Sequence, residues 1–153
     1  MKLDLGCGMN KHPGFIGVDK EPYPGVDVIH NLNKFPWPFQ DNSVDEIIAF
    51  NVLEHLECPY RAVLEMIRIS MPGAVWHIRF PYWEHENAWK DPDHKYALTP
   101  EFFKRFLGIE VVSEELHFPH KAPRLNALSL KLRFAFLKKY LPDEWRLKVV
   151  VRK

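Results

Sequence analysis

A short apolar run that ends in two closely spaced glycines constrains the fold of this chain more than any other feature. Residues 3–8 read LDLGCG, and the next apolar run ends in an acid, Asp19. A glycine turn after a strand lets backbone N–H groups approach a polar ligand closely. An acid at the tip of the following strand can accept hydrogen bonds from ribose hydroxyls. Together these features predict a nucleoside-binding site in an α/β protein.

Strand-like and helix-like patterns alternate along the chain, which favours a mostly parallel sheet. The expected strands comprise residues 2–5, 15–19, 26–30, 44–50, 74–80, 109–118 and 145–152. The chain has 153 residues, of which 46% are hydrophobic. This is the length of one ordinary domain, so we expect a single domain over residues 1–153.

Two helices are expected between the later strands. An apolar stripe at helical spacing predicts a helix from Pro59 to about Ser70, stopped by the Pro-Gly pair at 72–73. Thr99 is expected to cap a second helix that runs to Gly108. Residues 124–141 fit both a strand and a helix periodicity, and their length favours a helix.

Composition narrows the class of protein. The net charge of +1 provides no overall field toward nucleic acid or acidic lipid. No apolar stretch approaches the roughly 18 residues of a membrane-spanning helix, so no membrane partner is expected. Met1 runs directly into the first strand, which leaves no room for a signal peptide. Cys7 and Cys58 form no C-x-x-C pair, so we interpret both as reduced thiols in a cytoplasmic protein.

The order and spacing of several motifs resemble the class I S-adenosylmethionine-dependent methyltransferases, in particular the small methyltransferase-type-11-like members. Residues 3–8 look like the family's first glycine motif, and residues 17–19 (GVD) resemble the acidic end of its second strand. Further similar segments are residues 41–47, 52–56, 68–73, 91–94 and 99–102. The resemblance implies a Rossmann-like α/β fold, with a mostly parallel seven-stranded sheet and an antiparallel last strand. It also implies transfer of a methyl group from S-adenosylmethionine to an acceptor that the sequence does not identify.

The resemblance implies that the glycine turn and the following acid hold the cofactor. Gly6, Cys7 and Gly8 would lie against its amino-acid end. Asp4 would either support the turn or meet the cofactor's amino group through water. Asp19 would bind the ribose hydroxyls.

Four further cofactor contacts and a neighbouring lysine are implied in the same way. Lys20 would lie beside the ribose-binding acid. Asn31 and Leu32, after the third strand, would lie at the adenine. Asn51 and Leu53, at the end of the fourth strand, would face the methionine part of the cofactor or the substrate.

The connection between the first two strands is too short for the helix that relatives have there. It runs only from Gly6 to Gly14, whereas a parallel crossover usually needs about a dozen residues. We therefore expect a tight loop. The strand at 74–80 alternates apolar and polar residues, which predicts that one face of the sheet is thinly covered. That face is either solvated or covered by a second subunit, and we hypothesise a homodimer.

Methyl transfer from a sulfonium depends mainly on positioning. A general base matters only if the acceptor must lose a proton during attack. The candidate bases are Glu54, His55, His85 and His94. Each also has a simpler interpretation, as a capping or loop residue satisfied by the backbone.

Two other kinds of site are weighed. His117 and His120 form an H-x-x-H pair, but Pro119 disrupts a regular helix and companion cysteines are lacking, so no metal is expected. The basic segment 121–139 could bind nucleic acid, although such charges more often form the solvated face of a helix. Two alternative functions therefore stay open: a catalytically inactive methyltransferase-like binding or partner subunit, and a nucleic-acid-binding protein that uses this segment.

Overall fold

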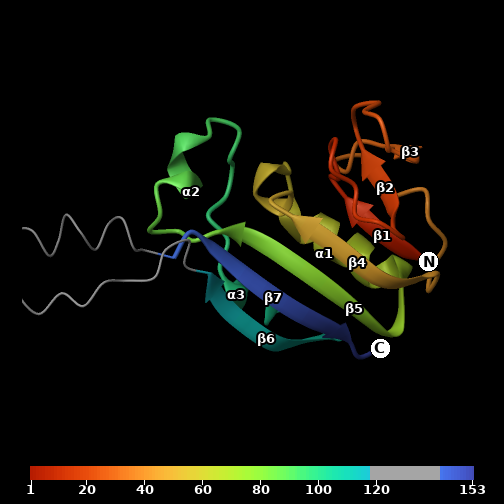
Figure 1. Cartoon of the computed structure of the whole chain (residues 1–153). Helices are drawn as coiled ribbons and strands as arrows, with labels where there is room; N and C mark the ends of the chain where they lie inside the picture. The colour runs from red at the N-terminus through yellow and green to blue at the C-terminus, as the bar shows by residue number, and fades with distance from the viewer. Residues whose placement is uncertain (118–141) are drawn as a thin grey trace, which may run out of the picture.

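The computed structural model describes residues 1–117 and 142–153, and there seven strands form one sheet (Figure 1). The strands are β1 (Lys2–Leu5), β2 (Ile16–Asp19), β3 (Val28–Ile29), β4 (Val44–Phe50), β5 (Ser70–Pro81), β6 (Ile109–His117) and β7 (Glu144–Val151). Their order is β3-β2-β1-β4-β5-β7-β6, and β7 runs antiparallel to both of its neighbours. The remaining pairs are parallel. This confirms the predicted Rossmann-like sheet with an antiparallel last strand.

The α-helices α1 (Pro59–Ile69) and α3 (Pro100–Phe103) cover one face of the sheet. The 3-10 helix η1 (Leu53–His55) and the short α2 (Asn87–Lys90) lie beyond the ends of β4 and β5 (Figure 1). The apolar stripe of α1 is buried against the apolar side of β4 and β5, and Phe103 of α3 stacks on Phe80. In the described ranges no helix is long and apolar enough to cross a bilayer.

The opposite face of the sheet carries no helix among the described residues (Figure 1). The connection at residues 6–15 is helix-free, as expected from its length. Along β5 the side chains of Trp76 and Ile78 are fully buried, whereas His77 and Arg79 between them are half-exposed. The thinly covered face predicted from this alternation is therefore present.

The first helix ends close to the predicted Ser70, but the predicted start of the next strand at residue 74 and the role of the Pro-Gly pair as a helix stop are wrong. The helix ends at Ile69, and β5 already begins at Ser70, so the Pro-Gly pair at 72–73 lies within that strand. Ser70 is held in an extended conformation because its buried hydroxyl accepts a hydrogen bond from Trp76 Nε1 at 2.8 Å. A contact within β5 therefore overrides the helical pattern.

Two other predicted boundaries change, and one predicted cap is not formed. Helix α3 ends at Phe103 instead of Gly108, because the chain turns there to bury Phe106. Thr99 occupies the N-cap position, but its side chain makes no capping hydrogen bond. Strand β3 has only two residues instead of the span 26–30. The predicted helix at 124–141 lies outside the described residues.

Candidate functional site

A cleft of about 470 Å³ opens at the carboxyl ends of the parallel strands. The glycine turn after β1, the end of β2 and the segment after β4 form its walls, together with residues 30–33. In the strand order β2 is the neighbour of β1 on one side, and β4 is its neighbour on the other side. The direction in which the chain adds strands therefore reverses at β1. Ligands of open α/β sheets bind at this reversal point, beyond the carboxyl ends of the strands.

Asp19 connects β2 directly to the glycine turn. Its Oδ2 accepts a hydrogen bond from the Gly8 N–H at 2.9 Å, and its Oδ1 accepts one from the Glu21 N–H at 3.0 Å. An ionised carboxylate has about four acceptor sites, so Asp19 keeps acceptor capacity toward the cleft that it lines. The two elements on which the predicted site depends are therefore within contact of one ligand.

Gly6 is the one residue of the turn that lines the cleft. Its N–H donates to the Val18 carbonyl at 2.7 Å, and its φ is +63°. A Cβ at this position would lie only 2.6 Å from Val52 Cγ2. Glycine is required here for two reasons: the backbone has a positive φ, and Val52, just after β4, approaches the turn closely.

Asp4, Cys7 and Gly8 lie outside the lining of the cleft. Asp4 is buried, its Oδ2 accepts the His12 N–H at 2.8 Å, and His12 Nδ1 lies 2.9 Å from the same oxygen. Asp4 therefore supports the turn, which is one of its two predicted roles. The Cys7 thiol faces Gly17, and burial raises the pKa of Cys7.

The loop after β3 forms the far wall of the cleft. Lys20, Asn31 and Leu32 all line it, as the family resemblance implies. Asn31 also closes a local turn, because its Oδ1 accepts the Asn33 N–H at 2.9 Å. His30 lines the cleft too, although the sequence analysis did not single it out.

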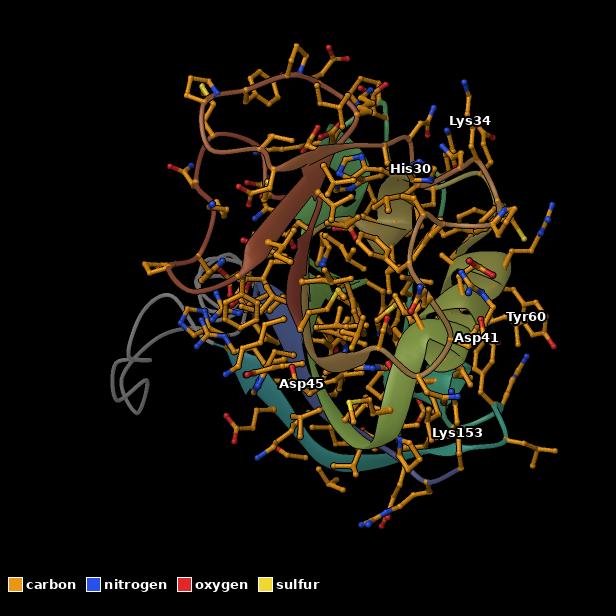
Figure 2. All side chains as sticks on the ribbon, turned by 90° about the vertical axis from the view of Figure 1, so that its right-hand side faces the viewer. His30, Lys34, Asp41, Asp45, Tyr60 and Lys153 are labelled. Atoms are coloured by element: carbon orange, nitrogen blue, oxygen red, sulfur yellow. The ribbon has the colours of Figure 1, made fainter. Side chains whose placement is uncertain are left out.

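The position of His30 follows from a local contact. Figure 2 shows its side chain beside Lys34 at one end of the molecule, away from Asp41 and Lys153. One ring nitrogen, Nε2, lies 3.0 Å from the Lys34 carbonyl oxygen. Residues that the sequence analysis also missed are Asn33, Val52, Leu56, Glu57, Asp93 and Lys95.

Asn51 stands between this cleft and a second pocket of about 440 Å³. Its φ of +53° turns the chain out of β4, and its N–H donates to the Arg79 carbonyl at 2.9 Å. Asn51 and His55 line both cavities. Leu53, by contrast, is 1% exposed and packs in the core, so it lines neither cavity.

Three of the four candidate bases come together beside the second pocket. One ligand-type atom from each of Glu54, His55 and His94 lies within 4.8 Å of the others. Burial raises the pKa of Glu54 to about 7 and lowers the pKa of His55. His85 lies apart: its Nδ1 accepts the Asn87 N–H at 3.2 Å, and it lines neither cavity.

The sequence pair of His117 and His120 is only partly described. His117 Nδ1 lies 2.9 Å from Asp143 Oδ1, at the start of β7. His120 and the basic segment 121–139 lie outside the described residues.

The strand order and the cleft at the carboxyl edge define a Rossmann-like α/β protein. Residues 7–78 match the family model described as a methyltransferase domain. An uncharacterized methyltransferase of Mycobacterium tuberculosis is 30% identical over 82 residues, which cover 46% of this chain and 32% of that protein. A Mycolicibacterium smegmatis protein named "Probable S-adenosylmethionine-dependent methyltransferase" is 42% identical over 60 residues, which cover 39% of this chain and 23% of that protein.

The fold is shared with the crystal structure of a SAM dependent methyltransferase from Archaeoglobus fulgidus. The TM-score is 0.67 at 19% identity, with 97% of this chain and 85% of that chain covered. With the sequence matches, this confirms that the chain resembles the class I S-adenosylmethionine-dependent methyltransferases. The chain spans about a third or less of the length of the curated relatives that it matches.

Proposed function

We propose that this protein binds S-adenosylmethionine in the carboxyl-edge cleft and transfers its methyl group to an acceptor held in the adjoining pocket. The observation that carries the proposal is the direct contact between the two motif elements. Gly8 N–H donates to Asp19 Oδ2, while Gly6 and Asp19 both line the cleft. A single ligand can thus meet bare backbone at one point and a carboxylate at the next.

The residues of the cleft fit the chemistry of this cofactor. Asp19 retains acceptor capacity for ribose hydroxyls, and Gly6, whose missing Cβ lets Val52 pack against the turn, lines the cleft beside it. Leu32 and Val52 provide apolar surface for an adenine ring. When bound, S-adenosylmethionine supplies an electrophilic methyl group on a positively charged sulfur.

The second pocket is the natural place for the acceptor. It shares Asn51 and His55 with the cofactor cleft, so a molecule in it adjoins a molecule in the cleft. Its other lining residues include Lys90, Asp91 and Glu144, which favour a polar acceptor. Holding two reactants side by side supplies most of the acceleration that such a transfer needs.

Calorimetry on the full chain tests the proposal. We expect saturable binding of one S-adenosylmethionine per chain and of its demethylated product, because both carry the same adenosyl group. Turnover is then assayed against small metabolites, glycans and nucleic acids. Binding of neither nucleoside, together with salt-dependent binding of DNA or RNA, would instead support the nucleic-acid alternative. Binding without turnover on any acceptor would support the inactive-subunit alternative.

We also propose that the helix-free face of the sheet is covered by a second copy of the chain. Both signs of charge lie on this face: Arg146 is opposite Arg79 and Lys148 is opposite His77, while Glu46 lies on β4. Within the chain Arg146 pairs with Glu144, and Glu46 pairs with Lys2. Like charges opposite one another, such as Arg79 and Arg146, destabilise a sheet, and a two-fold axis can bring such cations against acids of the partner copy.

Light scattering tests the homodimer. We expect twice the chain mass at micromolar concentration for the natural protein. Val75→Glu on the helix-free face should halve that mass, because a charge is buried in the interface. Leu64→Glu, on the exposed side of α1, serves as a control and should leave the mass unchanged. A monomer mass for the natural protein would refute the assignment.

A further inference from the structure

We propose that Glu54, His55 and His94 bind one divalent transition-metal ion beside the acceptor pocket. Their ligand-type atoms lie within 4.8 Å of one another, so modest side-chain rotations bring them to the roughly 3 Å separation that bonds of about 2.0–2.1 Å require. No metal is expected from the sequence, where the spacing of the histidines, Pro119 and the lack of companion cysteines all speak against one. The fold brings together residues that this spacing does not connect.

The Glu54 carboxylate is the strongest indication. It is 1% exposed, and neither of its oxygens has a hydrogen-bond partner among the residues that the structure describes. Burying an unpaired carboxylate is costly, and buried charges are usually paired or coordinate metals. Two imidazoles, those of His55 and His94, have a ring nitrogen within 4.8 Å of one of its oxygens. A cation held between them removes the cost.

His94 is oriented as a metal ligand requires. Its Nδ1 lies 3.3 Å from the Ala88 carbonyl oxygen, which can only accept a hydrogen bond. The tautomer that donates from Nδ1 leaves a lone pair on Nε2 for a metal ion, and Asp91 Oδ2 lies 3.8 Å from this nitrogen. Metal-binding histidines almost always donate their other ring N–H to such an acceptor. The His94 side chain is 9% exposed, so its orientation is set by packing.

Backbone contacts hold the two parts of the cluster together. The Lys95 N–H donates to the Glu54 carbonyl at 2.8 Å, and the Tyr96 hydroxyl donates to the Glu57 carbonyl at 3.0 Å. These bonds fix the loop of His94 against η1, which carries Glu54 and His55. The two segments that carry the cluster are therefore held together by the fold, and only side-chain rotations are needed to bring the three ligand atoms together.

The donor set indicates the class of ion. Two imidazole nitrogens and one carboxylate suit zinc, iron, manganese or cobalt, and three protein ligands leave coordination positions open. Mg²⁺ prefers oxygen ligands and does not suit this set. Because His55 and His94 line the second pocket, the open positions face it. A metal there can bind and orient an acceptor oxygen, a role that rests on the proposed function, whereas metal binding itself does not.

Titration of the full chain with Co²⁺, followed by visible absorption and calorimetry, tests the proposal. We expect one Co²⁺ per chain, displaced by Zn²⁺ and unaffected by Mg²⁺. Glu54→Gln and His94→Asn should each weaken binding by at least about 10-fold, the lower end of the loss that even outer partners of metal ligands cause. His85→Asn in the same loop is the matched control and should bind Co²⁺ normally.

The outcomes separate this inference from the proposed function. Glu54→Gln should lose Co²⁺ and still bind S-adenosylmethionine, while Asp19→Ala should lose S-adenosylmethionine and still bind Co²⁺. Circular dichroism shows whether each variant is folded. Because Glu54→Gln keeps one ligand and Asp19→Ala keeps the other, the retained binding also shows that each variant is folded. Absence of Co²⁺ uptake, a thiolate charge-transfer band, or an equal loss in His85→Asn would overturn the metal site.

Discussion

Replacing Asp19 by alanine is expected to weaken S-adenosylmethionine binding by about 3 kcal/mol, or about 100-fold. Two effects combine in this variant. The carboxylate that would accept hydrogen bonds from the ribose is removed. The Gly8 N–H also loses its acceptor, Asp19 Oδ2, which lies 2.9 Å from the Gly8 nitrogen and holds the turn in place. Asp19→Asn keeps one carbonyl acceptor and should lose less. Calorimetry with the cofactor and its demethylated product measures both variants.

Asp27 provides a matched control for this experiment. It also accepts a backbone N–H, from Gly17 at 2.7 Å, but it does not line the cleft. Asp27→Ala should therefore keep the natural affinity. Equal affinity of Asp19→Ala and the natural protein would remove the ribose assignment. A similar loss in both alanine variants would mean that the effect reflects general loosening of the loop.

Gly6→Ala is expected to lower the free energy of unfolding by about 3 kcal/mol. About 1 kcal/mol comes from placing a side chain at φ +63°, and about 1–3 kcal/mol comes from overpacking against Val52, whose Cγ2 would lie 2.6 Å away. Urea unfolding of the natural and variant proteins measures the difference. The same variant should also bind S-adenosylmethionine less well, because its methyl group narrows the cleft.

Gly14 separates the two contributions. Its φ is +82°, but a Cβ there would meet nothing within 4 Å. Gly14→Ala should therefore show only the backbone cost, about 1 kcal/mol. If Gly6→Ala and Gly14→Ala unfold at the same urea concentration, the contact with Val52 contributes nothing to the loss of unfolding free energy in Gly6→Ala. The tight packing of the turn would then not explain its glycine.

The sheet could be predicted from the sequence because each of its strands is locally consistent. The alternation of buried Trp76 and Ile78 with half-exposed His77 and Arg79 was sufficient to predict a sheet with one thinly covered face. The early start of β5 at Ser70 could not be predicted, since Ser70 is held by a buried hydrogen bond from Trp76 of the same strand. Local propensity carries no information on such a bond.

The site was predictable where its residues belong to short motifs. Gly6, Asp19 and Asn51 follow strand ends, and the structure brings all three to one cleft. The group formed by Glu54 and His94 had no comparable signal. It depends on the backbone bond from Lys95 to Glu54, which joins segments that lie far apart in the chain. Only the folded loop reveals that these side chains adjoin.

The helix-free connection after β1 has an electrostatic consequence. A glycine turn that ran into a helix would offer a ligand the positive end of the helix dipole. Residues 6–15 contain no helix, so the field around the cleft comes from charged side chains. These are two lysines, Lys20 and Lys95, and three acids, Asp19, Glu57 and Asp93, and Lys95 is paired with Glu57. The field of such side chains is screened within about 8 Å at physiological ionic strength. The electrostatic pull of this cleft on charged ligand groups therefore weakens as ionic strength rises.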